Sequence, residues 1–115
     1  TPRPRTQALR RRVAGEGLLG VLVEAMVAFP HHVNLQVQAM HCLCNVTIHS
    51  QETQQQAVDA GVLPAIIQMM RLHPHDPELS RAGRVACMSR FRKPEHMQLA
   101  VRLGAKQDWW DPSFL

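Results

Sequence analysis

Hydrophobic and polar residues follow the period of an α-helix along most of this chain. Over residues 62 to 72, Leu63, Ile66, Ile67 and Met70 stand three or four positions apart, which places them on one helix face. Stripes of this kind, together with capping and breaking residues, predict further helices over about residues 17 to 29, 33 to 48, 51 to 60, 78 to 91 and 95 to 103. The sequence therefore predicts an all-α fold.

Start and stop signals mark several of these helix ends. Ser50 can cap the helix that begins at Gln51, because a serine hydroxyl accepts a hydrogen bond from a free amide of the first turn. Gly61 is suited to end that helix, since glycine adopts the left-handed conformation without strain. Pro64 is tolerated in the first turn of the next helix, and Pro94 ends the helix before it.

The chain also repeats itself. AVDAG at residues 57 to 61 returns as AVRLG at residues 100 to 104, an offset of 43, and a fainter copy, VAGEG, ends at Gly17. A period in the low forties is typical of solenoids built from two- or three-helix repeats. We divide the chain into a basic leader, partly disordered or forming a first short helix (residues 1 to 15), a first repeat (16 to 50), a second repeat (51 to 93) and a partial third repeat or C-terminal cap (94 to 115).

Composition agrees with helices and localises the charge. Hydrophobic residues make up 45% of the chain and Tyr is absent, so Leu, Val, Ala and Met must fill the core. The formal net charge of +4 arises in residues 1 to 15, which hold five Arg and no acid. A second basic run consists of Arg81, Arg84, Arg90, Arg92 and Lys93. Each run is either a solvated surface or a binding site for phosphate or for an acidic partner.

Three Cys do not form a disulfide framework, and we expect a reducing compartment. Cytoplasm is the expected location, with nucleus, cilium and organelle left open. No apolar run approaches the roughly 20 residues that cross a membrane, so we expect no membrane span.

Two segments resemble the armadillo repeat family. QAVDAGVLP at residues 56 to 64 is similar to the junction between the first two helices of an armadillo unit, and AMHCLCN at residues 39 to 45 is similar to its third helix. The resemblance covers roughly residues 8 to 104. It implies a right-handed superhelical solenoid of short three-helix repeats, which is not an enzyme. Third helices of successive units would line a groove that holds an extended segment of a partner protein.

The resemblance also assigns a partner-binding surface. Asn45 stands where the family's Asn bonds a peptide backbone, and His41 stands where the importin-α branch has Trp. In the next unit Arg84 and Met88 occupy those places, which argues against basic nuclear-import signals and favours acidic segments. Residues 41 and 45 share a helical face in any case. Asn45 as a brace for a neighbouring helix, and the arginines as a solvated face, are the alternatives. The full predicted set is Gln38, His41, Asn45, Arg81, Arg84, Met88, Trp109 and Trp110.

Trp109 and Trp110 depart from the repeat. Two adjacent indoles cannot both face inward on one helix, so we expect one to cap the open end of the solenoid and the other to meet a partner. About two and a half units are present, whereas about three are usually needed for stability. We therefore expect either a longer parent protein or packing in a homo- or hetero-oligomeric assembly.

Other chemistry receives little support. His41, Cys42, Cys44 and His49 invite a zinc site, yet residues two apart on a helix point about 200° apart and the chain has no Cys-x-x-Cys pair. Cys87 lacks a carboxylate at readable spacing that would orient a catalytic histidine. We expect no catalytic residue, metal or cofactor. The alternative function is nucleic-acid or phosphate binding through the arginine runs, against which stand few aromatic residues and a near-neutral body.

Overall fold

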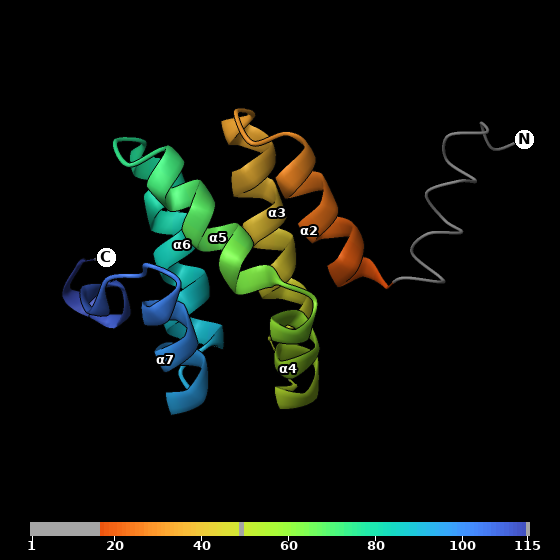
Figure 1. Ribbon diagram of the computed structural model, residues 1–115, viewed down its shortest axis with the longest axis vertical. Helices are drawn as coiled ribbons and strands as arrows, with labels where there is room; N and C mark the ends of the chain where they lie inside the picture. Colours follow the sequence, from red (N-terminus) through yellow and green to blue (C-terminus); the bar gives the residue numbers. More distant parts are fainter. Residues whose placement is uncertain (1–16, 49, 115) are drawn as a thin grey trace, which may run out of the picture.

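The computed structural model describes residues 17 to 48 and 50 to 114, and these residues form helices and no strand. Figure 1 shows their arrangement. The six α-helices and two short 3-10 helices are α2 (Leu18–Ala28), α3 (Val33–Val46), α4 (Gln51–Asp59), α5 (Val62–Leu72), α6 (Pro77–Arg90), α7 (Pro94–Arg102), η1 (Gln107–Trp110) and η2 (Pro112–Phe114). The prediction of an all-α chain is confirmed, and the helix ends lie within two residues of the predicted ones.

Local signals explain most of these ends. The Ser50 hydroxyl accepts a hydrogen bond from the amide of Thr53 at 3.2 Å, as its capping role requires. Helix α6 begins at Pro77, one residue before the predicted start, because the Asp76 carboxylate accepts the amide of Leu79 at 2.9 Å. Proline at the first helical position has no amide to satisfy and fits there.

The repeat in the sequence is also a repeat in the structure. Helices α2 and α5 both have 11 residues, α3 and α6 both have 14, and α4 and α7 both have 9. Corresponding helices begin 44, 44 and 43 residues apart. Among the described residues, a positive φ occurs only at Gly17, Gly61 and Gly104, with values of 82°, 92° and 112°. Each of these glycines precedes the start of an equivalent segment, and a side chain there would be strained.

Equivalent helices also lie against each other. Helix α2 contacts α5, and α3 makes the most extensive helix–helix contact of the described chain with α6. Figure 1 shows α3 and α6 beginning at the same end of the molecule, behind α2 and α5. Arg90 donates from Nε to the carbonyl of Cys44 at 3.1 Å, which joins the ends of α6 and α3. The His73 ring bonds to the carbonyl of Pro30 at 2.8 Å and joins the loops at the other end.

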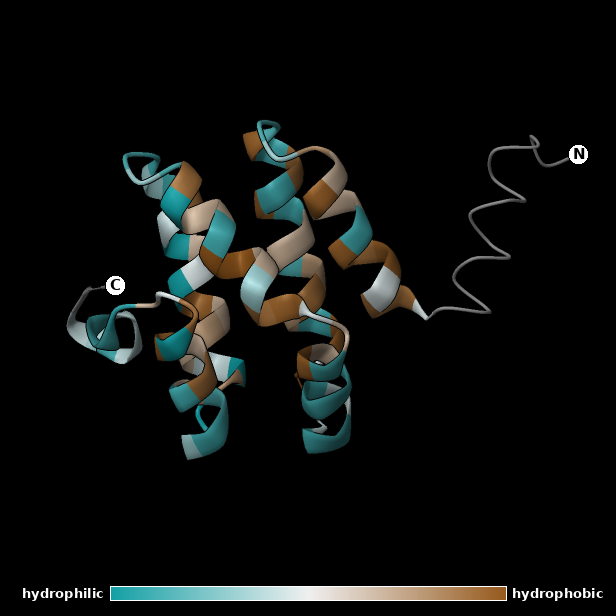
Figure 2. Cartoon of the chain, viewed as in Figure 1, coloured by the Kyte–Doolittle hydropathy of each residue, from teal (hydrophilic) through white to brown (hydrophobic). Residues whose placement is uncertain are grey.

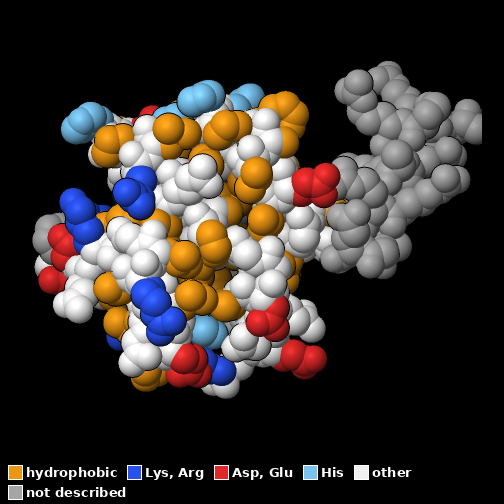
Figure 3. Space-filling model, viewed as in Figure 1, with side chains coloured by type: hydrophobic (Ala, Val, Ile, Leu, Met, Phe, Trp, Pro, Cys, Tyr) orange, Lys and Arg blue, Asp and Glu red, His pale blue; other side chains and the backbone are white. Residues whose placement is uncertain are grey.

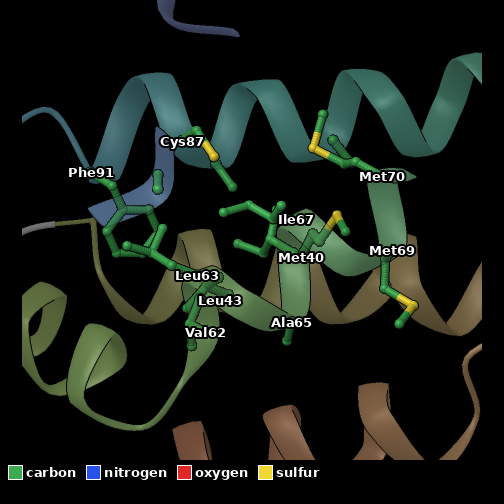
Figure 4. Packing of buried hydrophobic residues seen from close by; sticks show 14 of the residues in the cluster. Met40, Leu43, Val62, Leu63, Ala65, Ile67, Met69, Met70, Cys87 and Phe91 are labelled. Atoms are coloured by element: carbon green, nitrogen blue, oxygen red, sulfur yellow. The ribbon is translucent and has the colours of Figure 1, made fainter. Parts of the chain in front are cut away.

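Helix α5 is the centre of the hydrophobic core. It contacts α2, α4, α6 and α7, and seven of its 11 residues are buried. Figure 2 shows long hydrophobic runs on α2 and α5, while α4 is largely hydrophilic. Figure 4 shows Leu63 and Ile67 of α5 in one cluster with Met40 of α3, Cys87 of α6 and Phe91, the residue that follows α6. Removing a large side chain from such a site costs about 2–5 kcal/mol.

Gly83 allows α5 and α6 to approach closely. A Cβ atom at this position would lie 2.3 Å from Sδ and 2.8 Å from Cγ of Met70, far inside van der Waals contact. Figure 4 shows the Met70 side chain directed at α6. Glycine in a helix interior is unfavourable by roughly 1 kcal/mol relative to alanine, so the Met70 contact is the physical reason for a glycine here.

Gly83→Ala is expected to destabilise the chain by about 1–2 kcal/mol. Overpacking of a dense core costs typically 1–3 kcal/mol, which exceeds the gain in helix propensity. Urea unfolding followed by circular dichroism measures the change. Introduced together with Met70→Ala, the same substitution should instead stabilise relative to Met70→Ala alone, because the new methyl group then enters the vacated space. A stabilising effect in both backgrounds would contradict the close-contact explanation.

A buried glutamine fastens α2 to α3. The side-chain amide of Gln36, which is fully buried, donates to the carbonyl of Met26 at 3.0 Å and to that of Phe29 at 2.7 Å. Met26 belongs to the last turn of α2, where helical carbonyls have no partner within the helix, and Phe29 is the residue that follows the helix. The periodicity of the sequence gave no sign of this role, because a glutamine inside an apolar stripe looks like an interruption.

Gln36→Leu should lower the free energy of unfolding by about 2 kcal/mol. The substitution fits the cavity in size but leaves the buried carbonyl of Met26 without a donor, while the carbonyl of Phe29 keeps only the amide of His32. Chemical denaturation measures the loss, and Gln38→Leu, one half-turn away and exposed, is the matched control, with an expected change within about 0.5 kcal/mol. Equal effects of the two substitutions would show that the amide contributes nothing specific.

Candidate interaction surface

Three of the predicted partner-binding residues form one exposed stripe on α3. Gln38, His41 and Asn45 are all exposed and stand three and four positions apart, so they share a helical face. The buried residues of the same helix, Gln36, Val37, Ala39, Met40 and Leu43, lie mainly on the opposite side. Asn45 has no hydrogen-bond partner among the described residues. The alternative role, a brace for a neighbouring helix, therefore finds no supporting contact.

A second stripe on α6 repeats the spacing. Arg81 is exposed, and Arg84 and Met88 are half-buried, again three and four positions apart. Four of the five buried residues of α6 correspond to buried residues of α3 at an offset of 43: Leu79 to Gln36, Ala82 to Ala39, Gly83 to Met40 and Ala86 to Leu43. The fifth of each helix, Cys87 and Val37, has a half-buried counterpart. The stripes therefore lie in the same register, although the helix starts differ by 44. The sequence alignment that paired His41 with Arg84, and Asn45 with Met88, agrees with this burial pattern.

The two tryptophans correct one expectation. Trp109 and Trp110 are both buried, with 6% and 8% of their surface exposed. The expectation that one indole must face outward assumed an α-helix, whereas the segment is the 3-10 helix η1, which packs on α6. The Trp110 indole donates to the carbonyl of Phe91 at 3.1 Å, while Trp109 lies beside Arg84 in a different hollow. In the described chain, adjacent rings thus fill two separate positions.

Cysteine chemistry at this surface is not that of an activated nucleophile. Burial, and to a smaller extent the nearby Cys44, raise the pKa of the Cys87 thiol to about 12. Burial also raises the pKa of Cys44, against the opposing influence of Arg90. A reactive cysteine needs the opposite shift. Among the described residues no three His, Cys, Asp or Glu side chains are placed to hold a metal ion, and His49 of the proposed zinc set lies outside them.

Sequence reasoning missed one hollow. Arg71, Arg84 and Lys106 line it together, and they come from α5, α6 and the segment after α7. No spacing rule joins residues from three elements that are distant in the chain. The sequence had identified Arg84 and Trp109 as partner-binding candidates and Gly104 as the counterpart of Gly61, but it gave no reason to group them. The arginines of residues 1 to 15 lie outside the described residues.

The chain was compared with protein-family models, with curated proteins and with solved structures, and nothing matches it. The armadillo resemblance therefore rests on the residues alone. No helix in the described part of the chain has the length and apolar character needed to span a membrane.

Trp110→Phe is expected to lower the free energy of unfolding by about 1–2 kcal/mol, because the carbonyl of Phe91 loses the hydrogen bond that the Trp110 indole donates to it. Trp109→Phe is the matched control, since its indole has no hydrogen bond among the described residues. Thermal or urea unfolding compares the two variants, and the remaining indole in each should show the blue-shifted emission of a buried ring. Red-shifted emission from the remaining tryptophan of either variant would contradict the burial of both indoles.

Proposed function

We propose that this chain is a non-catalytic protein-interaction module of the armadillo type, which holds an extended segment of a partner across α3 and α6. The observation that carries the proposal is the pair of exposed stripes, Gln38 to Asn45 and Arg81 to Met88, set in one register on adjacent helices. The counterpart residues stand 43 positions apart, so the same surface is presented twice.

Three features support a solenoid arrangement. Equal helix lengths recur at offsets of 43 and 44, a glycine with positive φ precedes both α2 and α5, and each helix of the second unit lies against its counterpart or is linked to it. The link between α4 and α7 is the hydrogen bond between Gln55 and His96 at 3.0 Å. In solenoids such nearest-neighbour interfaces supply much of the stability. The right-handed superhelix remains a prediction.

The chemistry of the stripes suits an extended backbone. Neighbouring packed helices lie about 8–10 Å apart, a distance that an extended chain covers in roughly three residues. A segment crossing α3 and α6 would therefore meet Asn45 and then the α6 stripe. The amide of Asn45 offers both a donor and an acceptor, which matches the carbonyl and amide of one extended residue.

The charge on α6 favours acidic partners. Arg81 is exposed and Arg84 is half-buried, whereas the α3 stripe carries no carboxylate. A guanidinium binds carboxylates in a bidentate manner, which gives direction as well as charge. We therefore propose acidic residues in the part of the segment that crosses α6.

The alternative, nucleic-acid binding through the second arginine run, meets an obstacle in that run. Arg90 donates to the carbonyls of Cys44 and Ser89, so one member is engaged in joining the helices. Salt separates the alternatives, because nucleic-acid binding falls steeply as salt rises, whereas a groove with apolar and amide contacts is less sensitive.

Selection of short linear peptides on the immobilised chain tests the proposal. We expect enrichment of acidic sequences. Asn45→Ala should lower the affinity for every selected peptide by about tenfold, because it removes the hydrogen bonds to the peptide backbone. Arg81→Gln should weaken only the acidic peptides, and more strongly at low salt. Fluorescence anisotropy measures the affinities.

Gln51→Ala on α4, at an exposed position away from both stripes, is the control and should leave binding unchanged. Peptides that bind wild type and Asn45→Ala equally would show that the α3 stripe is not the binding surface. Selection of oligonucleotides with a steep salt dependence, in place of peptides, would favour the alternative.

A further inference from the structure

The hollow between α5, α6 and the segment after α7 gathers three positive side chains. Arg71 comes from the last turn of α5, Arg84 from the middle of α6, and Lys106 from the segment that follows α7. The hollow has a volume of about 320 Å³, and no carboxylate lines it. Figure 3 shows Lys and Arg side chains on the half of the visible face formed by α5, α6 and α7, and none over the visible part of α2.

The position of Arg71 depends on Gly104. A Cβ atom at Gly104 would lie 2.9 Å from Nη1 and 3.5 Å from Cζ of Arg71, so the guanidinium rests against the glycine backbone. The equivalent glycines have no such neighbour: Gly61 would meet only Val23, at 3.9 Å, and Gly17 would meet nothing within 4 Å. Among the described residues a glycine with positive φ thus occurs three times, but a cation lies against it only once.

Two of the three charges of the hollow, those of Arg71 and Lys106, are not neutralised within the described chain. No described carboxylate pairs with Arg71 or Lys106. Arg84 has a further interaction within the chain, so the argument rests on the other two cations. Ser80 adds a hydroxyl to the lining, and Met70, Pro74 and Trp109 add apolar wall. This combination of donors and apolar wall suits an anion carried on a short side chain.

We propose that this hollow binds the phosphate of a phosphorylated serine or threonine in a partner segment. A phosphomonoester carries about −1.5 to −2 charges and three acceptor oxygens, which matches several cations and a hydroxyl better than a single carboxylate does. Guanidinium groups bind phosphate in a bidentate manner. The volume leaves room for the methylene or methyl of the phosphorylated residue beside Trp109.

The inference rests on the proposed function, because the phosphate would belong to the partner segment that crosses α6. Arg84 belongs both to the α6 stripe and to the hollow, so a segment that crosses α6 passes the opening. The site itself can be tested without any peptide, which separates its failure from a failure of the stripe.

Titration with a capped phosphoserine, followed by NMR of ¹⁵N-labelled protein, tests the site. Saturable shifts are expected at the Trp109 indole and at the amides of Gly104 to Lys106, with the Trp110 indole as internal reference. The variant Arg71→Gln plus Lys106→Gln should bind about tenfold more weakly or worse. Arg92→Gln plus Arg102→Gln loses the same charge at two exposed positions and should bind as wild type does.

Three results would overturn the assignment. They are equal binding by the two double variants, capped glutamate binding as tightly as capped phosphoserine, and adenosine monophosphate binding more than tenfold tighter than phosphoserine. The second result would make the ligand a carboxylate, and the third a nucleotide. If circular dichroism shows that the variant Arg71→Gln plus Lys106→Gln does not fold, the single variant Lys106→Gln replaces it. This single variant should bind phosphoserine about threefold more weakly than wild type. If the hollow binds phosphoserine while Asn45→Ala leaves peptide binding unchanged, the phosphate site is supported and the peptide-binding role of the α3 stripe is contradicted.

Discussion

Helix α5 is enclosed by α2, α4, α6 and α7, and the rest of the described structure depends on that enclosure. Its buried residues cover a little over half of its circumference, and the exposed Pro64, Gln68, Arg71 and Leu72 share the remaining side. The closest approach, at Gly83 and Met70, requires the absence of a side chain on α6. Because α5 holds α6 from one side and α2 holds α3, the opposite sides of α3 and α6 are left to solvent. The exposed stripes are thus a consequence of the core.

A second constraint comes from the glycines that precede the equivalent segments. A left-handed residue turns the chain sharply, so that a first helix can be followed by a second one at an angle. Gly61 serves this turn between α4 and α5, and Gly104 follows α7 with a positive φ. Gly17 also has a positive φ, but its ψ of 156° is extended. At Gly104 the missing side chain has another consequence, since the backbone there is open to the Arg71 guanidinium. A feature required by the fold thus also shapes a cationic hollow.

Helix content, helix ends and the repeat were predictable because they rest on local signals. Ser50 and Pro94 act on residues within one turn, and the stripe on α5 needs only its own spacing. The stripe of Gln38, His41 and Asn45 was predictable for the same reason. Contacts between distant residues were not. Gln36 looked like an interruption, the two tryptophans were judged by α-helical geometry, and the hollow joins side chains up to 35 positions apart, from Arg71 to Lys106.

The segment after Gly104 explains why the hollow lies where it does. One unit earlier, residues 62 to 72 continue as a long helix after the left-handed glycine, whereas here Lys106 and the short helix η1 follow. Trp109 and Trp110 then pack on α6 and on the end marked by Phe91, where a regular helix would place one ring outward. This departure from the repeat brings Lys106 beside Arg71 and Arg84 instead of beside another helix. The place at which the sequence stops repeating is therefore the place at which the structure gains a surface that the repeat alone does not provide.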